Sequence, residues 1–195
     1  MSQDEERALG QALTRAVAGR TISLVGNARS LLDGRLGPQI DAGCVVRLNS
    51  GVPIRPAAQG RRTDIHCFST RSSLEDNLRR AGWRVRWKRR SLDDAFSIWM
   101  SKMERETATR AGQAFYPLSM VAALDAQLGA PSSVGAKALH MLFTLTEGEI
   151  HLFGFDFKAS TTFYRKRENR GPHDWDAERA FALSLAETGR VFIHG

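Results

Sequence analysis

The chain has 195 residues, of which 42% are hydrophobic and 25% are charged, a composition that is typical of a soluble globular domain and excludes intrinsic disorder. Lysine and arginine number 28 against 21 acidic residues, which gives a formal net charge of +7. The longest uncharged stretch covers residues 111–124 and contains a proline, so it is too short for a membrane span, which needs about 20 apolar residues.

The start of the chain and its two cysteines indicate a compartment and a redox state. Residues 4–6 are all acidic and stand where a secretory signal would carry basic residues, so we expect a cytoplasmic protein. Cys44 and Cys67 lie in apolar runs without a CxxC partner or zinc-ligand spacing, and we expect both to be buried thiols. We expect a single domain over residues 1–195.

Hydrophobic periodicity predicts short apolar strands with helices between them. In chain order we expect a helix over 3–19, strands over 21–25, 43–48 and 64–68, helices over 92–110, 117–128 and 132–143, a strand over 149–153, a polar loop over 158–170, a helix over 175–187 and a strand over 190–193. Short apolar strands at this spacing favour parallel pairing. The fold class expected is therefore α/β: a Rossmann-like, doubly wound, mostly parallel sheet flanked by helices, with ligands bound beyond the carboxyl ends of the strands.

Residues 79–90 are strongly basic, contain no acidic residue, and are interleaved with Trp83 and Trp87. The basic residues are Arg79, Arg80, Arg84, Arg86, Lys88, Arg89 and Arg90. One interpretation is a solvated edge strand, because Trp83, Val85 and Trp87 alternate with basic residues at a period of two. The other is a surface for an anionic partner, for which peripheral membrane contact is favoured over nucleic acid.

Small polar residues and glycines follow three of the predicted strands and begin one predicted helix. They are Gly26-Asn27, Asn49-Ser50-Gly51, Gly154-Phe155-Asp156 and, at the helix start, residues 131–135. Backbone N–H groups and the dipole at a helix start attract anions, so a phosphate site is one interpretation, and ordinary turns are the other. The turn after residue 25 has one glycine where a dinucleotide fingerprint needs three, and the chain has no GxxxxGK[ST] sequence.

Residues 173–178 form the densest group of ionisable side chains. The acidic residues favour a helix N-terminus, and this alone would explain Asp174 and Asp176; a metal-binding DxD is a weaker interpretation, and we expect no metal. His173 follows a Gly-Pro pair in a loop, where we expect it to be accessible to solvent, and histidine is a residue type suited to the role of general base. His66, His140 and His151 fall inside predicted strands or helices and are expected to be structural.

Together these segments resemble glycosyltransferase family 29, the sialyltransferases, as a small soluble bacterial-type member. The long motif of the family is matched by Ile22–Asn27, Gly37–Asp41, Val46–Asn49 and Gly60–Asp64; the short motif by Pro131–Gly135 and Phe153–Asp156; the third motif by Phe163-Tyr164; and the very short motif, His-x4-Glu, by His173 and Glu178. The matches run from residue 22 to residue 178. The resemblance implies a GT-A-variant-like single domain.

The resemblance also implies a role for each matching residue. Asn27 and Asn49 would hydrogen-bond the phosphate and ribose of a CMP-sugar, while Ser132, Ser133 and Gly135 would hold the cytidine and phosphate. Gly154 would line the nucleotide pocket and Tyr164 would contact the donor phosphate. His173 would be the catalytic base, and Glu178 would support it or its helix.

The activity implied is inverting transfer of a 2-keto acid sugar of the sialic acid type from a CMP-sugar to a hydroxyl of a glycan or glycolipid acceptor, without cofactor or divalent metal. The cysteine pair of the family is absent, with Thr21 or Ile22 in place of its first member, and Val134 is an extra residue in the short motif. A cytosolic, reducing location would explain the missing pair.

Three alternatives stay open. CMP-Kdo has the same nucleotide, carboxylate and anomeric chemistry, so a Kdo transferase of bacterial surface polysaccharide, at the inner membrane surface, is the first. A non-enzymatic module that binds an anionic surface or nucleic acid through residues 79–90 is the second. A catalytically inactive CMP-binding relative is the third. A further basic stretch, Arg165, Lys166, Arg167 and Arg170, either steers an anionic substrate or is a solvated loop.

Overall fold

The computed structural model describes residues 2–80, 83–106, 113–157, 161–164 and 172–194. Within these residues the elements are α1 (Ser2–Val17), β1 (Ile22–Val25), the 3-10 helix η1 (Arg29–Asp33), α2 (Gly37–Ala42), β2 (Cys44–Leu48), α3 (Pro56–Gln59), β3 (Ile65–Phe68), α4 (Arg71–Arg80), α5 (Trp83–Trp87), α6 (Arg90–Asp93), β4 (Phe96–Trp99), β5 (Ala114–Phe115), α8 (Leu118–Leu128), α9 (Val134–Leu145), β6 (Ile150–Phe153), α10 (Trp175–Ala186) and β7 (Val191–His194). The five predicted strands and four of the five predicted helices are confirmed.

The strands form one seven-stranded sheet in the order β5-β4-β3-β2-β1-β6-β7, and every adjacent pair is parallel. The chain first builds outward from β1 to β5 and then returns to place β6 on the free side of β1. The strand order therefore reverses between β1 and β6, which is where open α/β sheets bind their ligands. The predicted α/β, doubly wound, parallel fold class is confirmed.

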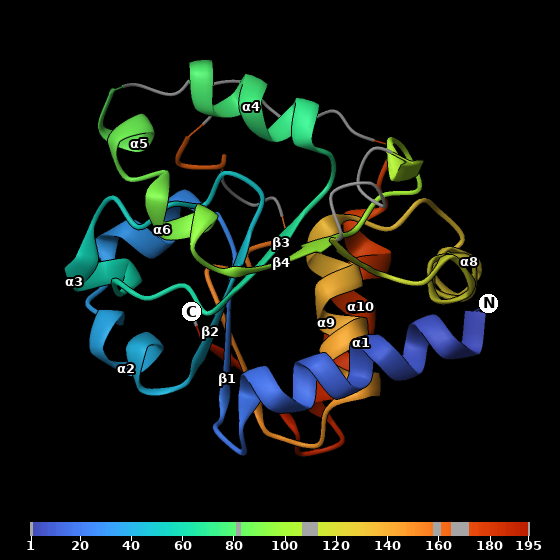
Figure 1. Cartoon of the computed structure of the whole chain (residues 1–195). Coiled ribbons are helices and arrows are strands. Elements are labelled where there is room, and N and C mark those ends of the chain that lie inside the picture. The colour runs from blue at the N-terminus through green and yellow to red at the C-terminus, as the bar shows by residue number, and fades with distance from the viewer. Residues whose placement is uncertain (1, 81–82, 107–112, 158–160, 165–171, 195) are drawn as a thin grey trace.

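The sheet is buried on both faces because its strands are apolar at nearly every position. Ile22 and Leu24 of β1 belong to the large core beneath α1, α8, α9 and α10, whereas Val25 belongs to a separate cluster beneath η1 and α2. A third cluster joins the same second face of the sheet to α4, α5 and α6. Figure 1 shows the resulting three layers, with α1, α9 and α10 on one side of the strands and α2 and α3 on the other.

The helix α1 illustrates how the layers close. Its buried residues Leu9, Leu13 and Val17 recur at a spacing of four and face the core, while charged residues cover its outer side. Among the described residues, no helix has both the length and the apolar character needed to cross a membrane.

The prediction of a helix over residues 92–110 is wrong where the structure describes that segment. Residues 96–99 form β4, an inner strand with Ile98 in the large core and Trp99 in the opposite cluster. A strand buried on both faces is a short continuous apolar run, and periodicity alone does not distinguish it from a buried helix. Residues 107–110 lie outside the described residues.

The edge-strand interpretation of residues 83–88 is also wrong, because residues 83–87 form the helix α5. Val85 points into the cluster of Leu78 and Leu92 and is 7% exposed. The two tryptophans, four residues apart, share the opposite face of the helix.

Cys44 and Cys67 are buried and free, as predicted. Burial in the sheet raises the pKa of the Cys44 thiol to about 11 and that of Cys67 further. Both are therefore protonated at neutral pH and unreactive.

Candidate active site

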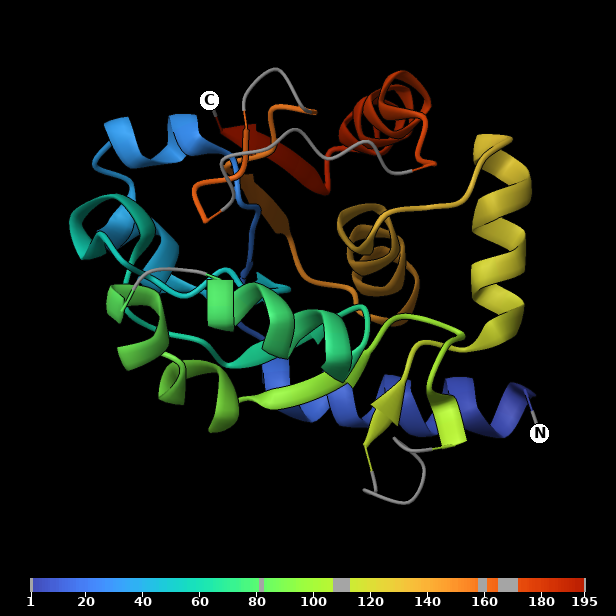
Figure 2. The same cartoon turned by 90° about the horizontal axis from the view of Figure 1, so that it is seen from above.

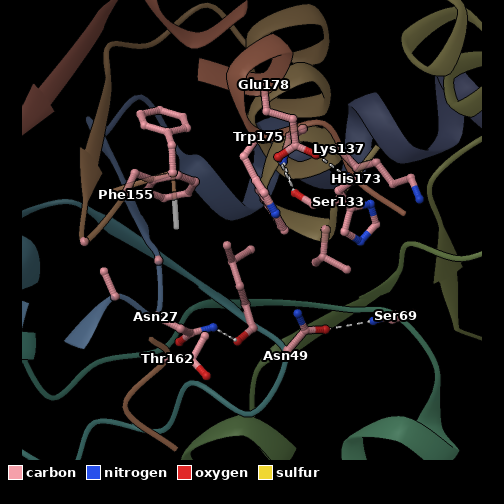
Figure 3. A pocket seen from close by; sticks show the side chains of 18 of the residues that line it. Asn27, Asn49, Ser69, Ser133, Lys137, Phe155, Thr162, His173, Trp175 and Glu178 are labelled. Carbon is pink, nitrogen blue, oxygen red and sulfur yellow. Dashed lines mark hydrogen bonds between the residues drawn. The ribbon is translucent and has the colours of Figure 1, made fainter. Parts of the chain in front are cut away.

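A pocket of about 450 Å³ lies at the carboxyl ends of β1, β2, β3 and β6, where the strand order reverses. Its walls come from the loops after these strands, the start of α9, the start of α10 and one face of α4. Figure 3 shows Asn27, Asn49 and Ser69 on one side of the pocket, with Ser133, Trp175 and His173 across from them.

All nine site residues predicted from the sequence line this one pocket. They are Asn27, Asn49, Ser132, Ser133, Gly135, Gly154, Tyr164, His173 and Glu178. They come from six segments spread over more than 150 residues of sequence. The sheet topology brings these segments together, so the residues share one cavity; their individual roles stay predictions.

The floor of the pocket is formed where the ends of β1 and β6 lie close together. Gly26 N donates to Phe153 O at 2.7 Å, and a Cβ at Gly26 would lie 2.3 Å from Gly154 O. Gly154 itself has a φ of +67°, a left-handed conformation that favours glycine. Both glycines are therefore required by the geometry of the point where the strand order reverses.

Two asparagine amides are fixed beside this floor. Asn27 Nδ2 donates to Leu48 O at 2.9 Å, which joins the end of β1 to the end of β2. Asn49 Oδ1 accepts from Ser69 N at 3.1 Å, so its Nδ2 points into the pocket as a hydrogen-bond donor (Figure 3). His66 Nε2 donates to Asn49 O at 2.7 Å. The side chains of Asn27 and Asn49 thus have fixed orientations before any ligand binds.

His66 is a structural residue, as predicted, and it stays neutral. It is 2% exposed in β3, and burial lowers its pKa to about 4. Since a carbonyl only accepts, its Nε2 carries the proton that holds the Asn49 backbone.

The start of α9 is held by two carboxylates. Ser132 donates from N and from Oγ to Asp125 Oδ1, at 2.7 and 2.5 Å. Ser133, the N-cap of α9, donates from N to Glu178 Oε1 and from Oγ to Glu178 Oε2, both at 2.7 Å. Since both serine hydroxyls donate to carboxylates and Ala136 N donates to Ser133 Oγ at 3.2 Å, the anion-binding donors at this helix start are chiefly the backbone N–H groups of Val134 and Gly135.

The backbone of this turn is open to the pocket because residue 135 is glycine. A Cβ there would lie 3.2 Å from the Phe155 ring and 3.5 Å from Ser133 Oγ. A side chain at this position would fill the space in front of the helix N-terminus.

His173 precedes α10 and is half-buried at the pocket wall. Its Nδ1 lies 2.7 Å from Pro131 O, and because a carbonyl only accepts, Nδ1 carries the proton. The lone pair is therefore on Nε2, the nitrogen that a general base uses. The Trp175 ring packs edge-on against the imidazole, with centroids 5.2 Å apart, and limits its rotation.

The acidic residues near His173 have structural partners. Asp174 caps α10, since its Oδ1 accepts from Asp176 N at 3.1 Å and Ala177 N at 3.0 Å. The helix-capping interpretation of Asp174 is confirmed. The carboxylate of Glu178 is buried against Ser133, so it fixes the start of α9. Over the described parts of the chain, no three His, Cys, Asp or Glu side chains group together as a metal site would need.

The segment that contains Tyr164 is tied to the loop after β1. Phe163 N donates to Asn27 O at 3.1 Å, and Arg29 N donates to Thr161 O at 3.0 Å. This pairing holds Tyr164 at the pocket wall. The basic stretch from Arg165 to Arg170 lies outside the described residues.

Sequence reasoning missed several residues that line the pocket. Lys137, in the first part of α9, is one; burial lowers its pKa, while Asp125 and Glu178 favour the charged form. Its position two residues after Gly135, in a helix start already identified, was a usable signal. Four residues of α4 are further examples: Ser73, Asp76, Asn77 and Arg80. No sequence pattern indicates that these residues line the pocket, because α4 lies over the strand ends only as a result of the connection from β3 to β4.

Comparison with known proteins shows similarity in structure alone. No protein-family model and no curated protein sequence matches the chain. A crystal structure of a mammalian sialyltransferase superposes with a TM-score of 0.66 at 20% identity, covering 100% of this chain and 79% of that one. CstII from Campylobacter jejuni, in complex with the substrate analogue CMP-3FNeuAc, superposes at 0.53 with 12% identity, covering 90% and 79% of the two chains.

A third solved structure, the monofunctional α-2,3-sialyltransferase Cst-I from Campylobacter jejuni, gives a TM-score of 0.61 at 12% identity, over 89% of this chain and 74% of that one. The chain therefore has a sialyltransferase-like, GT-A-like fold.

Proposed function

We propose that this chain is an inverting glycosyltransferase that moves a 2-keto acid sugar of the sialic acid type from a CMP-sugar to a hydroxyl of a glycan acceptor. The observation that supports this most directly is the convergence of all nine residues in one pocket at the reversal of strand order. The fold is shared with solved sialyltransferases, one of which is in complex with CMP-3FNeuAc.

The donor would bind with its phosphate at the start of α9. The start of a helix attracts anions through its backbone N–H groups, and the Nδ2 of Asn49 is a donor that points into the pocket. Lys137 adds a positive charge on the His173 side of the cavity, and Tyr164 adds a hydroxyl. These groups would stabilise the negative charge that develops on the departing CMP.

The reaction needs one proton acceptor. The acceptor hydroxyl oxygen attacks the anomeric carbon from the face opposite CMP, its proton passes to Nε2 of His173, and the bond from the anomeric carbon to the phosphate oxygen breaks with its electron pair leaving on CMP. The configuration inverts because attack and departure are on opposite faces. A positioned base contributes about 10²–10⁴-fold to such a step.

Glu178 would act as a positioning residue. Its two hydrogen bonds fix Ser133, and Ser133 caps the helix whose amides would face the phosphate. It thereby shapes the phosphate site without touching the substrate.

The absence of a metal or cofactor requirement, a single domain over residues 1–195 and a cytoplasmic location stay predictions. The first of these has a direct test. If amides and side chains are sufficient to hold the phosphate, CMP binds equally well with and without EDTA. A loss of binding in EDTA would contradict metal independence.

The primary experiment is calorimetric titration with CMP, with AMP and UMP as controls. We expect micromolar, CMP-selective binding that Asn49→Ala abolishes and that the exposed control Gln11→Ala leaves unchanged. Absence of CMP binding would overturn the proposal. If CMP binds, CMP-sialic acid and CMP-Kdo are then compared as donors, since the same nucleotide and carboxylate chemistry admits both. Binding without any transfer would identify an inactive relative.

A further inference from the structure

The short helix α5 exposes two tryptophans on one face. Trp83 is 73% exposed and Trp87 is 84% exposed, whereas Val85 on the opposite face is buried against α4 and α6. Large indole rings so open to water on a protein surface are uncommon and indicate a contact with an apolar or interfacial partner. The helix itself is anchored, because Lys88, just after it, donates from Nζ to Pro53 O at 2.8 Å.

The segment that carries these tryptophans has an excess of positive charge. Residues 71–94 contain eight basic and four acidic residues, so this segment accounts for +4 of the net charge of +7. Asp76 pairs with Arg79 and Arg80, and Glu75 pairs with Arg89. After these pairings a positive excess remains in the segment that carries the two indoles.

This surface adjoins the pocket. The helix α4, which supplies Asn77 and Arg80 to the pocket wall, leads directly to α5 along the chain. Figures 1 and 2 show α4 across the carboxyl ends of the strands and α5 beside the far end of α4. A partner that contacts α5 is therefore next to the pocket entrance.

We propose that the interfacial surface, defined as Arg79, Trp83, Trp87 and Arg90, docks on an anionic lipid bilayer and that the acceptor of the transfer is a glycolipid held in that bilayer. The acceptor class rests on the proposed function, whereas the docking itself does not. Indole rings favour the headgroup region of a bilayer, and basic residues are attracted to anionic lipids. The combination of the two signals is what stable peripheral binding requires.

The shape of the surface favours a bilayer over nucleic acid. Bases stack on aromatic rings inside a positively charged groove. Here both rings project from an exposed helix face, and neither lines the pocket. Flat contact with an interface needs no groove.

Vesicle flotation tests the docking. We expect the protein to float with phosphatidylcholine vesicles that contain about 30 mol% phosphatidylglycerol and to stay unbound with pure phosphatidylcholine. Trp83→Ala/Trp87→Ala should weaken binding at least about tenfold. Arg79→Gln/Arg90→Gln should weaken it about 25-fold, since each basic residue at an anionic surface contributes about fivefold.

Two matched controls should bind as the parent protein does. Met103→Ala/Leu183→Ala removes two exposed apolar side chains elsewhere, and Arg7→Gln/Arg15→Gln removes two exposed charges from α1. Thermal unfolding verifies that each variant is folded. Equal losses in the controls, or binding to a DNA oligonucleotide that vesicles fail to displace, would overturn the docking proposal.

The acceptor class is tested by comparing a glycolipid in these vesicles with the same glycan free in water. The tryptophan variant should lose transfer to the vesicle-bound acceptor at least about tenfold and keep transfer to the free glycan. Equal rates on both acceptors in both proteins would overturn the glycolipid assignment. Failure of CMP binding would instead overturn the proposed function and leave vesicle binding unaffected.

Discussion

The two walls of the pocket are built differently. On the α9–α10 wall the polar groups that hold the start of α9 are buried and hydrogen-bonded: Ser132 is 2% exposed, Ser133 9% and Glu178 6%. On the α4 wall the polar groups are exposed ion pairs of Asp76 with Arg79 and Arg80. A buried, satisfied network has one arrangement, whereas exposed pairs exchange partners freely. We infer that the first wall presents the donor site and the second faces the acceptor.

The largest effect on activity should come from the proposed general base, His173, on the α9–α10 wall. His173→Ala removes the only proton acceptor in the proposed mechanism, so kcat should fall about 10²–10⁴-fold. The Kd for CMP should change less than about twofold, because Asp125 and Glu178 still hold Ser132 and Ser133 at the start of α9 when the imidazole is removed. Steady-state kinetics and calorimetry measure the two quantities.

The matched control for this change is His151→Ala. His151 lies half-buried near the edge of the sheet, bonded to His194, and is not part of the pocket wall. It should keep full kcat. If the two histidine variants have similar kcat, His173 is not the base.

The next largest effect concerns the carboxylate that fixes α9. Glu178→Ala leaves the N–H and hydroxyl of Ser133 buried without their acceptor, which should lower the free energy of unfolding by about 3 kcal/mol. Affinity for CMP should fall as well, because the helix start loses its fixed position. Urea denaturation and calorimetry measure the two losses.

Glu149→Ala is the control for that change. Its carboxylate is mostly exposed, and it lies 3.6 Å from His151 Nε2, so its loss should cost less than about 1 kcal/mol. An equal cost at both positions would mean that the Glu178 bonds do not stabilise the wall.

A smaller, pH-dependent effect should arise beneath Asn49, between the two walls. Burial lowers the pKa of His66 to about 4, and its ordinary value in an unfolded chain is about 6.5. Between these values the unfolded chain binds a proton that the folded chain does not, so stability that is present above pH 6.5 is lost as the pH falls toward 4. From pH 7 to pH 5 this loss should be about 2 kcal/mol.

His66→Gln separates this effect from the titration of other groups. Glutamine keeps an N–H donor for Asn49 O but does not titrate, so the variant should lose about 2 kcal/mol less than the parent over the same pH range. Urea denaturation at both pH values measures the difference. Parallel losses in the two proteins would show that His66 is not responsible.

The two walls also differ in how far the sequence predicts them. The α9–α10 wall, which is the fixed wall, can be predicted, and the α4 wall, which is the exposed wall, cannot. The fixed wall and the floor follow from strand ends and helix starts, such as Asn27, Asn49 and Ser133, whose residue types have strong local preferences. Because the carboxyl ends of parallel strands meet at one edge of a sheet, predicting the strands placed these residues near one another. The Nδ1–H of His173 could not be predicted, since it depends on Pro131, more than 40 residues away.

The residues of the α4 wall could not be assigned to the pocket from the sequence, for a physical reason. The strand β4, at 96–99, is a short apolar run that a buried helix would also show, so the sequence does not reveal the connection that carries α4 over the pocket. Asp76 and Arg80 sit on a polar, exposed helix whose residue pattern is the same wherever the helix lies. Only the topology assigns them to the pocket.

The smallest effect should come from that exposed wall. Asp76→Asn removes the ion pairs with Arg79 at 2.6 Å and Arg80 at 3.4 Å while keeping the shape of the side chain. Because Asp76 is half-exposed and both arginines are largely in water, the free energy of unfolding should change by less than about 0.5 kcal/mol, and the Kd for CMP should stay within about twofold. Urea denaturation and calorimetry, run beside Glu178→Ala, make the comparison. A loss at Asp76 as large as that at Glu178 would place α4 in the fixed donor site, and the acceptor would then have to enter from the loop side of the pocket.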